Sequence, residues 1–199
     1  MILMYCWCYS GDNVPRGTIK KITMKITTEE IKKSIRNIPD FPKKGIQFKD
    51  VSTAFKNHEI LGYIVSEIGS YYEGFGITKV VGIESRGFIL GSSLANELKA
   101  GFIPIRKPGK LPAETYSQSY DLEYGSDSLE IHTDALDKND VVLIHDDLLA
   151  TGGTVNAAVD LVRKFGVTKI FVNFFVELDF LEGKERIASD VPVWSLIHF

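Results

Sequence analysis

The chain has 199 residues, of which 44% are apolar and 25% charged, a composition typical of one globular domain with a sizeable core. Its formal net charge of -3 argues against broad electrostatic binding of nucleic acid or of an anionic membrane surface. No apolar run approaches the roughly 20 residues that a transmembrane helix requires, so we expect neither a nucleic-acid partner nor a membrane.

The first 23 residues differ in character from the rest of the chain. They contain both cysteines, Cys6 and Cys8, so no intrachain disulfide can crosslink the rest of the chain. The lack of disulfides fits a reducing compartment, and we therefore expect a cytoplasmic protein. The apolar start lacks the preceding positive charge of a signal peptide. We therefore treat residues 1–23 as an atypical extension and expect a single domain over residues 24–199.

Two helices are predicted before any buried strand. Thr27 and Glu30 match a capping box, and isoleucines at helical spacing continue this first helix to about Pro39. The second helix is predicted over residues 57–73 by an apolar face, with Gly74 as its end.

From residue 78 onward, predicted strands alternate with predicted helices. Apolar runs predict strands at 78–83, 102–106, 141–145, 168–176 and 193–197. Helical periodicity predicts helices at 85–98 and 154–165, and a hairpin is predicted from 118–124 and 129–133. Repeated βα units predict an α/β fold, with a mainly parallel twisted sheet flanked by helices on both faces.

Two adjacent carboxylates and a glycine-containing run follow the strand predicted at 141–145. Glycines let a backbone approach a ligand closely, and a helix N-terminus carries partial positive charge, so this run is suited to a phosphate. Its threonines can donate hydrogen bonds to phosphate oxygens, and the two aspartates can accept them from the hydroxyls of an attached sugar. The order therefore predicts a ribose 5-phosphate site, whereas the alternative is a solvated turn. The residues are Asp146, Asp147, Ala150, Thr151, Gly152, Gly153 and Thr154.

This run resembles the phosphoribosyl-pyrophosphate motif of the type I phosphoribosyltransferases, and it is close to the motif of the adenine-specific members. The resemblance extends from Met24 nearly to the C-terminus, with short matches in the same order at 39–42, 84–88, 105–107, 109–112 and 122–125. It implies the type I phosphoribosyltransferase fold, with a small hood over the base site. One departure is His145, where the family usually has an aliphatic residue. We expect His145 simply to end its strand; the alternative is a hydrogen bond near the acidic pair.

A second segment between a buried strand and a helix holds Glu84, Ser85 and Arg86. Arg86 and the neighbouring backbone N–H groups can hold an anion. The resemblance implies that this segment is a pyrophosphate-binding loop, whereas a surface ion pair is the alternative for Arg86.

Three cations, Arg106, Lys107 and Lys110, flank a loop that contains proline and glycine. Such a loop can close over a polyphosphate and screen it from water. The resemblance implies a mobile catalytic loop, in which we expect Arg106 and Lys110 to act in catalysis and Lys107 in substrate binding. A solvated charged face is the alternative for Lys107.

The resemblance also implies the residues around the base. Glu123 takes a catalytic role there, handling a proton of the purine ring, although residue type alone favours an exposed strand carboxylate. The hood contains Gln47, Phe48 and Lys49, with Phe48 stacking on the ring while backbone groups read its edge. Without the resemblance, Phe48 reads as a core residue.

The implied reaction joins adenine to phosphoribosyl pyrophosphate, giving AMP and pyrophosphate, in purine salvage. Mg²⁺ is the implied cofactor, held mainly by substrate oxygens because it needs few protein ligands, and no dedicated metal cluster is evident. The family is typically homodimeric. The alternatives are another purine base, a non-catalytic regulator that senses the ligand, and a generic nucleotide-binding α/β protein. The third lacks support because neither common glycine-rich nucleotide motif occurs.

Overall fold

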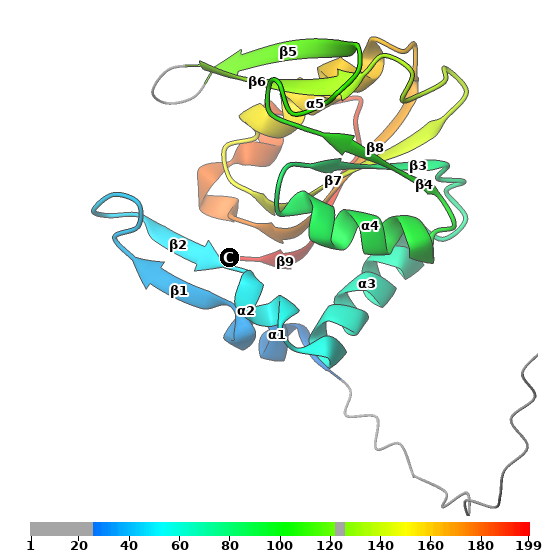
Figure 1. The fold of residues 1–199 in the computed structure, drawn as a ribbon. Coiled ribbons are helices and arrows are strands. Elements are labelled where there is room, and N and C mark those ends of the chain that lie inside the picture. Colours follow the sequence, from blue (N-terminus) through cyan, green and yellow to red (C-terminus); the bar gives the residue numbers. More distant parts are fainter. Residues whose placement is uncertain (1–25, 122–125) are drawn as a thin grey trace, which may run out of the picture.

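The computed structural model describes residues 26–121 and 126–199 (Figure 1). The extension predicted at residues 1–23 and the predicted base residue Glu123 lie outside the described residues. No helix within the described residues is long and apolar enough to cross a membrane.

A five-stranded, wholly parallel sheet forms the centre of the protein. Its strands lie in the order β4-β3-β7-β8-β9. Their bounds are β3 Lys79–Ile83, β4 Gly101–Ile105, β7 Val141–Leu149, β8 Lys169–Glu177 and β9 Val193–His198. The predicted strands are therefore confirmed, and so is the parallel sheet predicted from the βα units.

Helices cover both faces of this sheet, as the alternating pattern predicted (Figure 1). One face packs against α3 (His58–Tyr72) and α4 (Gly87–Glu97), and the other against α5 (Gly153–Arg163) and the hairpin of β5 (Thr115–Asp121) and β6 (Ser126–His132). Two separate apolar clusters, one on each side, exclude water from the sheet.

The N-terminal part corrects the prediction for the first helix. The capping box of Thr27 is confirmed, but α1 spans only Thr28–Ser34. Residues Arg36–Pro39 form β1 instead, which pairs antiparallel with β2, Gln47–Asp50. Pro39 disfavours helical backbone in the residue before it, and the β2 strand supplies hydrogen-bond partners that a sequence pattern does not reveal. The one-turn helix α2, Ser52–Phe55, was not predicted.

Strand β7 is longer than predicted, because it continues through the acidic pair to Leu149. The equally long β8 supplies partners along this extension, with Asp146 opposite Phe174. His145 therefore does not end the strand. It is fully buried, and its Nδ1 lies 2.8 Å from Asn173 Oδ1 on β8, so its hydrogen-bond partner is not the acidic pair. After β8 come two unpredicted short 3-10 helices, η1 (Asp179–Leu181) and η2 (Gly183–Arg186).

Candidate active site

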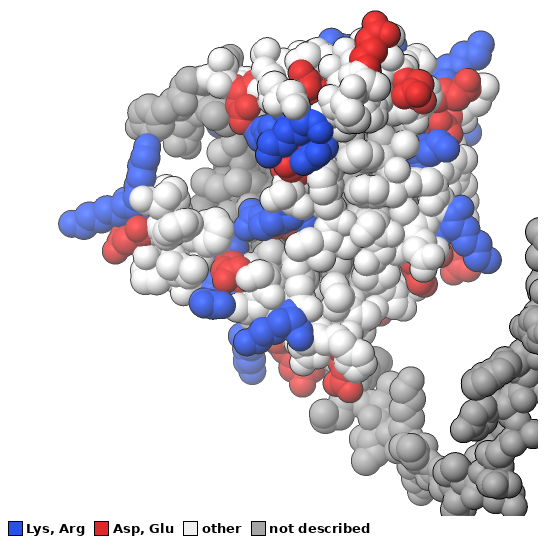
Figure 2. Space-filling view, viewed as in Figure 1, with Lys and Arg blue, Asp and Glu red and all other residues white. Residues whose placement is uncertain are grey.

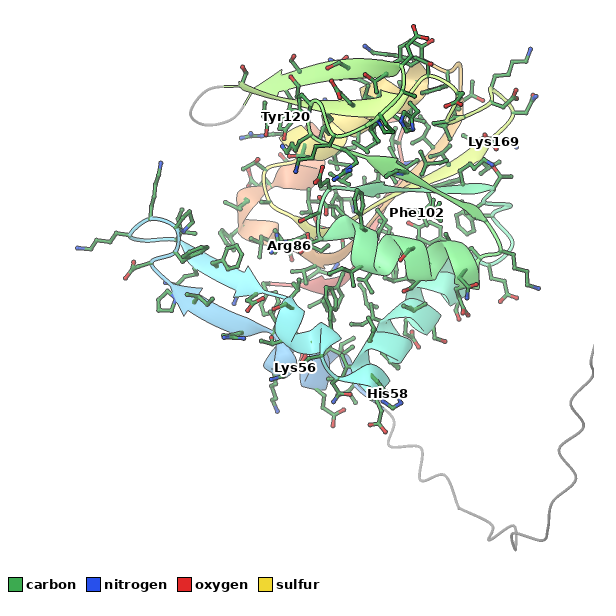
Figure 3. All side chains as sticks on the ribbon, in the orientation of Figure 1. Lys56, His58, Arg86, Phe102, Tyr120 and Lys169 are labelled. Carbon is green, nitrogen blue, oxygen red and sulfur yellow. The ribbon has the colours of Figure 1, made fainter. Side chains whose placement is uncertain are left out.

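The predicted anion-binding segments meet at one edge of the sheet. Strands β3 and β7 are parallel neighbours, so the segments after their carboxyl ends, 84–86 and 150–154, emerge side by side. Viewed as in Figure 1, the surface is hollowed between the β1–β2 pair and the rest of the protein, and lysine and arginine side chains border this hollow (Figure 2). In Figure 3, Arg86 lies at the sheet edge facing β1–β2, and Tyr120 extends from the hairpin above it.

The turn after β7 leaves the first backbone N–H groups of α5 available to bind an anion. Gly152 is the residue before the helix and has a φ of 82°, a left-handed conformation that favours glycine. No side chain caps the helix, and its first hydrogen bond runs from Asn156 N–H to Gly152 O at 3.1 Å. The N–H groups of Gly153, Thr154 and Val155 therefore precede the first helical hydrogen bond and are available to a ligand.

A cavity of about 90 Å³ lies beside this turn. Asp146 borders it at one end, and Ala150, Thr151, Gly152 and Thr154 border it along the turn. The structure thus places one carboxylate of the acidic pair and the threonine-glycine run around the same space, as the sequence predicted.

The acidic pair is poorly solvated. Asp147 is 2% exposed, Asp146 is half-buried, and the Asp147 N–H donates to Asp146 Oδ1 at 2.9 Å. Burial raises the pKa of both carboxyls; the charge of Asp147 adds to the increase at Asp146, and the nearby Arg86 opposes the increase at Asp147. Carboxylates that have lost their water interact strongly with a donor or a positive charge placed beside them.

Arg86 connects the acidic pair to the β1–β2 pair. Its Nε lies 3.0 Å from Asp147 Oδ2, and its guanidinium carbon lies 5.5 Å from the centre of the Phe48 ring. Phe48 also contacts the exposed Phe41 edge-on, with ring centres 5.1 Å apart. Phe48 is therefore half-buried at the rim of the site, and it is not a residue of the core.

Glu84 forms hydrogen bonds with the cationic residues of the loop after β4. It accepts hydrogen bonds from Arg106 Nε at 3.3 Å and Nη2 at 3.1 Å, from Lys110 Nζ at 2.9 Å, and from the Lys107 backbone N–H at 3.1 Å. These bonds, with that of Arg106 the strongest, lower the pKa of Glu84 to about 2. The structure thus brings Glu84, Arg106 and Lys110 together.

The side chain of Lys107 lies apart from this cluster. Its Nζ donates to Tyr120 Oη at 2.9 Å and forms an ion pair with Asp127, both on the β5–β6 hairpin. Only its backbone reaches Glu84. In this structure the Lys107 side chain links the loop to the hairpin and does not face the anion site.

The remaining predicted residues occupy the rim. Gln47 Oε1 accepts a hydrogen bond from Asn37 Nδ2 at 2.7 Å within β1–β2, and Lys49 Nζ lies 4.2 Å from the centre of the Phe199 ring. The Ser85 carbonyl accepts the Phe88 N–H at 3.2 Å, near the start of α4. Asn173, which pairs with His145, and Gly183, whose backbone approaches Ala150, are not predicted from the sequence, because both contacts join segments that are distant in the sequence. The signal at Gly183 is a glycine in a charged turn.

Among the described residues, one group of side chains brings possible metal ligands close together. Glu177, Asp179 and His198 have ligand atoms within 4.8 Å of one another at the ends of β8 and β9. This group is already internally paired, because Ser195 Oγ donates to Glu177 at 2.6 Å and His198 Nδ1 lies 2.8 Å from Asp179.

Comparison with known proteins agrees with this geometry. Residues 56–192 match the family model described as the phosphoribosyl transferase domain. The chain is 58% identical to the adenine phosphoribosyltransferase of Bacteroides thetaiotaomicron over 174 residues, which cover 87% of this chain and 99% of that protein. It is 54% identical to that of Phocaeicola vulgatus over 172 residues, covering 86% and 99% of the two chains.

Solved structures give the same result for the fold. The adenine phosphoribosyltransferase of Thermoanaerobacter pseudethanolicus superposes with a TM-score of 0.84 at 48% identity, covering 87% of this chain and all of that one. The Giardia lamblia enzyme complexed with 9-deazaadenine also gives 0.84, at 41% identity, covering 87% and 98%. The chain therefore belongs to the phosphoribosyltransferase family and, within it, to the adenine phosphoribosyltransferases.

Proposed function

We propose that this protein transfers the 5-phosphoribosyl group from phosphoribosyl pyrophosphate to adenine, giving AMP and pyrophosphate, and so serves purine salvage. The observation that carries the proposal is the shared cavity of Asp146 and the turn before α5. A carboxylate beside uncapped helical N–H groups suits a sugar that bears a 5′-phosphate, because the N–H groups bind the phosphate and the carboxylate accepts hydrogen bonds from the sugar hydroxyls.

In this proposal the phosphoribosyl group is held from both ends. The N–H groups of Gly153 and Thr154, with the hydroxyls of Thr151 and Thr154, bind the 5′-phosphate, and Ala150 and Gly152 shape the turn. Asp146 and Asp147 accept hydrogen bonds from the ribose hydroxyls. As the bond to pyrophosphate breaks, positive charge develops on the ribose, and the two carboxylates stabilise it electrostatically.

The leaving pyrophosphate is assigned to the cations on the neighbouring strand ends. Arg86, with the backbone of Glu84 and Ser85, binds it at the start of α4, and Arg106 and Lys110 turn from Glu84 to its oxygens. Negative charge that develops on the leaving group is offset by these fixed cations. Lys107 contributes by holding the loop to the hairpin through Asp127.

The base is assigned to the space between the β1–β2 pair and the edge of the sheet. Phe48 stacks on the purine ring, and the backbone of Gln47 and Lys49 reads its edge, since their side chains have partners elsewhere. Glu123, which lies outside the described residues, takes the role near the ring proton that the family resemblance implies.

Mg²⁺ fits the donors of this site. Asp146 and Asp147 are hard oxygen donors beside the assigned ribose, and Mg²⁺ bound mainly through substrate oxygens and waters needs few protein ligands. When bound, the ion supplies positive charge that neutralises the pyrophosphate oxygens.

The proposal extends to the whole protein: a cytoplasmic homodimer whose catalytic domain spans residues 24–199. Light scattering tests the dimer. Removal of residues 1–23 is expected to leave the rate of AMP formation unchanged, and a large loss in a folded truncation would contradict the domain assignment.

The decisive experiment measures AMP from labelled adenine and phosphoribosyl pyrophosphate, with and without Mg²⁺. Adenine is expected to react in preference to hypoxanthine, guanine and xanthine in competition, and only when Mg²⁺ is present. Preferred turnover of another base would change the substrate assignment, while tight binding of phosphoribosyl pyrophosphate without any turnover would favour a ligand-sensing regulator.

A further inference from the structure

The backbone of Gly183 packs directly against the proposed phosphate-binding turn. A Cβ atom added at Gly183 would overlap the Ala150 carbonyl oxygen and lie 2.9 Å from the Ala150 carbonyl carbon. A Cβ at Gly152 would in turn overlap the Gly183 carbonyl oxygen and lie 3.3 Å from its carbon. Two glycines far apart in the sequence thus bring two backbones into contact, which any side chain would prevent.

The side of this contact that carries Gly183 is held firmly. Glu182 N–H donates to Asp179 O at 3.1 Å, and Ile187 N–H donates to Lys184 O at 3.2 Å, which fixes the turn on both sides of Gly183. Ile187 is 6% exposed and lies in the same apolar cluster as Val155 of α5. The segment of residues 182–187, which we term the brace, is therefore anchored in the core behind the phosphate-binding turn.

The turn itself contributes little of its own rigidity. It spans only residues 150–152 between β7 and α5, and its glycine has left-handed backbone that no side chain caps. Anion binding by N–H groups depends on their directions, so whatever sets the position of this backbone also sets its affinity for phosphate.

We propose that Gly183 is a positioning residue for the 5′-phosphate: the brace fixes the Ala150–Gly153 backbone so that its N–H groups converge on one anion. This inference rests on the proposed function of the turn and adds to it a determinant outside the motif. Gly183 does not contact the substrate; it acts through Ala150 and Gly152.

The test compares Gly183→Ala with Gly62→Ala. The backbone of Gly183 does not lie in the left-handed region, so alanine is disfavoured there by contacts: chiefly the overlap with the Ala150 backbone, and also Leu149 Cδ1 at 3.1 Å. An added Cβ at Gly62, in α3, meets nothing within 4 Å, which makes this variant the matched control. For each protein, the affinities for AMP and for adenosine are measured by calorimetry, because the two ligands differ only in the phosphate.

Gly183→Ala is expected to weaken AMP binding roughly 10- to 100-fold while changing adenosine binding less than about twofold. The KM for phosphoribosyl pyrophosphate rises in parallel, and the KM for adenine does not. A general loss of structure would weaken both ligands equally and lower the thermal midpoint without this split. Gly62→Ala is expected to match the wild type in ligand affinities and KM values, with a slightly higher thermal midpoint because alanine is the better helix former.

The outcomes separate this inference from the proposed function. If the wild type binds AMP no more tightly than adenosine, the phosphate site itself is wrong. If the wild type prefers AMP and Gly183→Ala keeps the same preference, the phosphate site stands and the role of the brace is overturned.

A milder pair of variants covers the case in which Gly183→Ala does not fold. Ile187→Val loosens the anchor of the brace, and Ile170→Val removes the same methyl group from an equally buried isoleucine of the same cluster, at the start of β8. The preference for AMP over adenosine is expected to fall about two- to threefold only in Ile187→Val. Equal preferences in the two variants would overturn the proposal.

Discussion

Glu84 and Arg106 form a paired contact, in which the Arg106 Nη2 and Nε lie 3.1 and 3.3 Å from the two carboxylate oxygens of Glu84. The pair joins the segment after β3 to the segment after β4, two neighbouring parallel strands. Because the pKa of Glu84 is lowered to about 2, its charge is present at every pH at which the protein is expected to work. A permanent anion thus holds the cations that we assign to pyrophosphate.

Glu84→Gln is expected to bind Mg²⁺-pyrophosphate roughly 3- to 10-fold more tightly, because one negative charge is removed beside the bound anion. Its kcat is expected to fall, since Arg106 and Lys110 lose the partner that orients them. Calorimetry and steady-state kinetics measure the two effects. Asp190→Asn, which breaks the exposed Arg163–Asp190 pair, is the control. Unchanged pyrophosphate affinity in Glu84→Gln would show that Glu84 does not compete for these cations.

Replacing Asp146 and Asp147 together by asparagine is expected to lower kcat at least about 100-fold while preserving the fold. Burial raises the pKa of both carboxyls, so their charged forms are costly in the native state, and the neutral variant should melt at the same temperature or higher. Activity and circular dichroism melts on one preparation test both parts. Wild-type rates of AMP formation in this variant would refute the assigned ribose contact.

The two loop lysines are expected to behave differently despite their proximity in the sequence. Lys110→Met removes a cation that faces Glu84 and should raise the KM for phosphoribosyl pyrophosphate roughly 10-fold. Lys107→Met removes the ion pair with Asp127 and should instead expose the β5–β6 hairpin to faster hydrogen exchange. The reverse pattern, with Lys107→Met raising KM and Lys110→Met silent, would mean that the loop rearranges its cations on binding.

His145 predicts a specific dependence of stability on pH. Burial lowers its pKa from 6.5 to about 4, so between these values the unfolded chain binds a proton that the native protein does not. The stability due to neutral His145 is fully present above pH 6.5 and is lost as the pH falls toward 4, by up to about 3 kcal/mol.

Urea unfolding from pH 7 to pH 4.5 checks this expectation. The free energy of unfolding of His145→Val should fall less over this range than that of the wild type, although its value at pH 7 is lower because Asn173 loses its partner. His58→Gln, at an exposed position on α3, should follow the wild type. Parallel curves for all three proteins would place the proton uptake elsewhere.

Local rules account for what the sequence predicted well. The capping box of Thr27, the strands of the sheet and the turn before α5 each depend on residues within one turn or one strand of each other. The first helix was predicted too long because isoleucines at 31, 35 and 38 suit a helix, whereas residues 36–39 pair with a strand eight residues further on. The role of His145 was also wrong, since its partner lies 28 residues away.

The alternation of strands and helices after residue 78, the parallel sheet and the residue chemistry of the turn from Asp146 to Thr154 are predictable from the sequence alone, because hydrophobic period, glycine placement and helix starts are short-range properties. Three relationships emerge only from the folded chain: Glu84 holds Arg106 and Lys110, the Lys107 side chain faces the hairpin, and the Gly183 backbone packs against the turn. These contacts join segments separated by 13 to 33 residues, and their geometry follows from how parallel strands and the turns after them pack together, which no local pattern encodes.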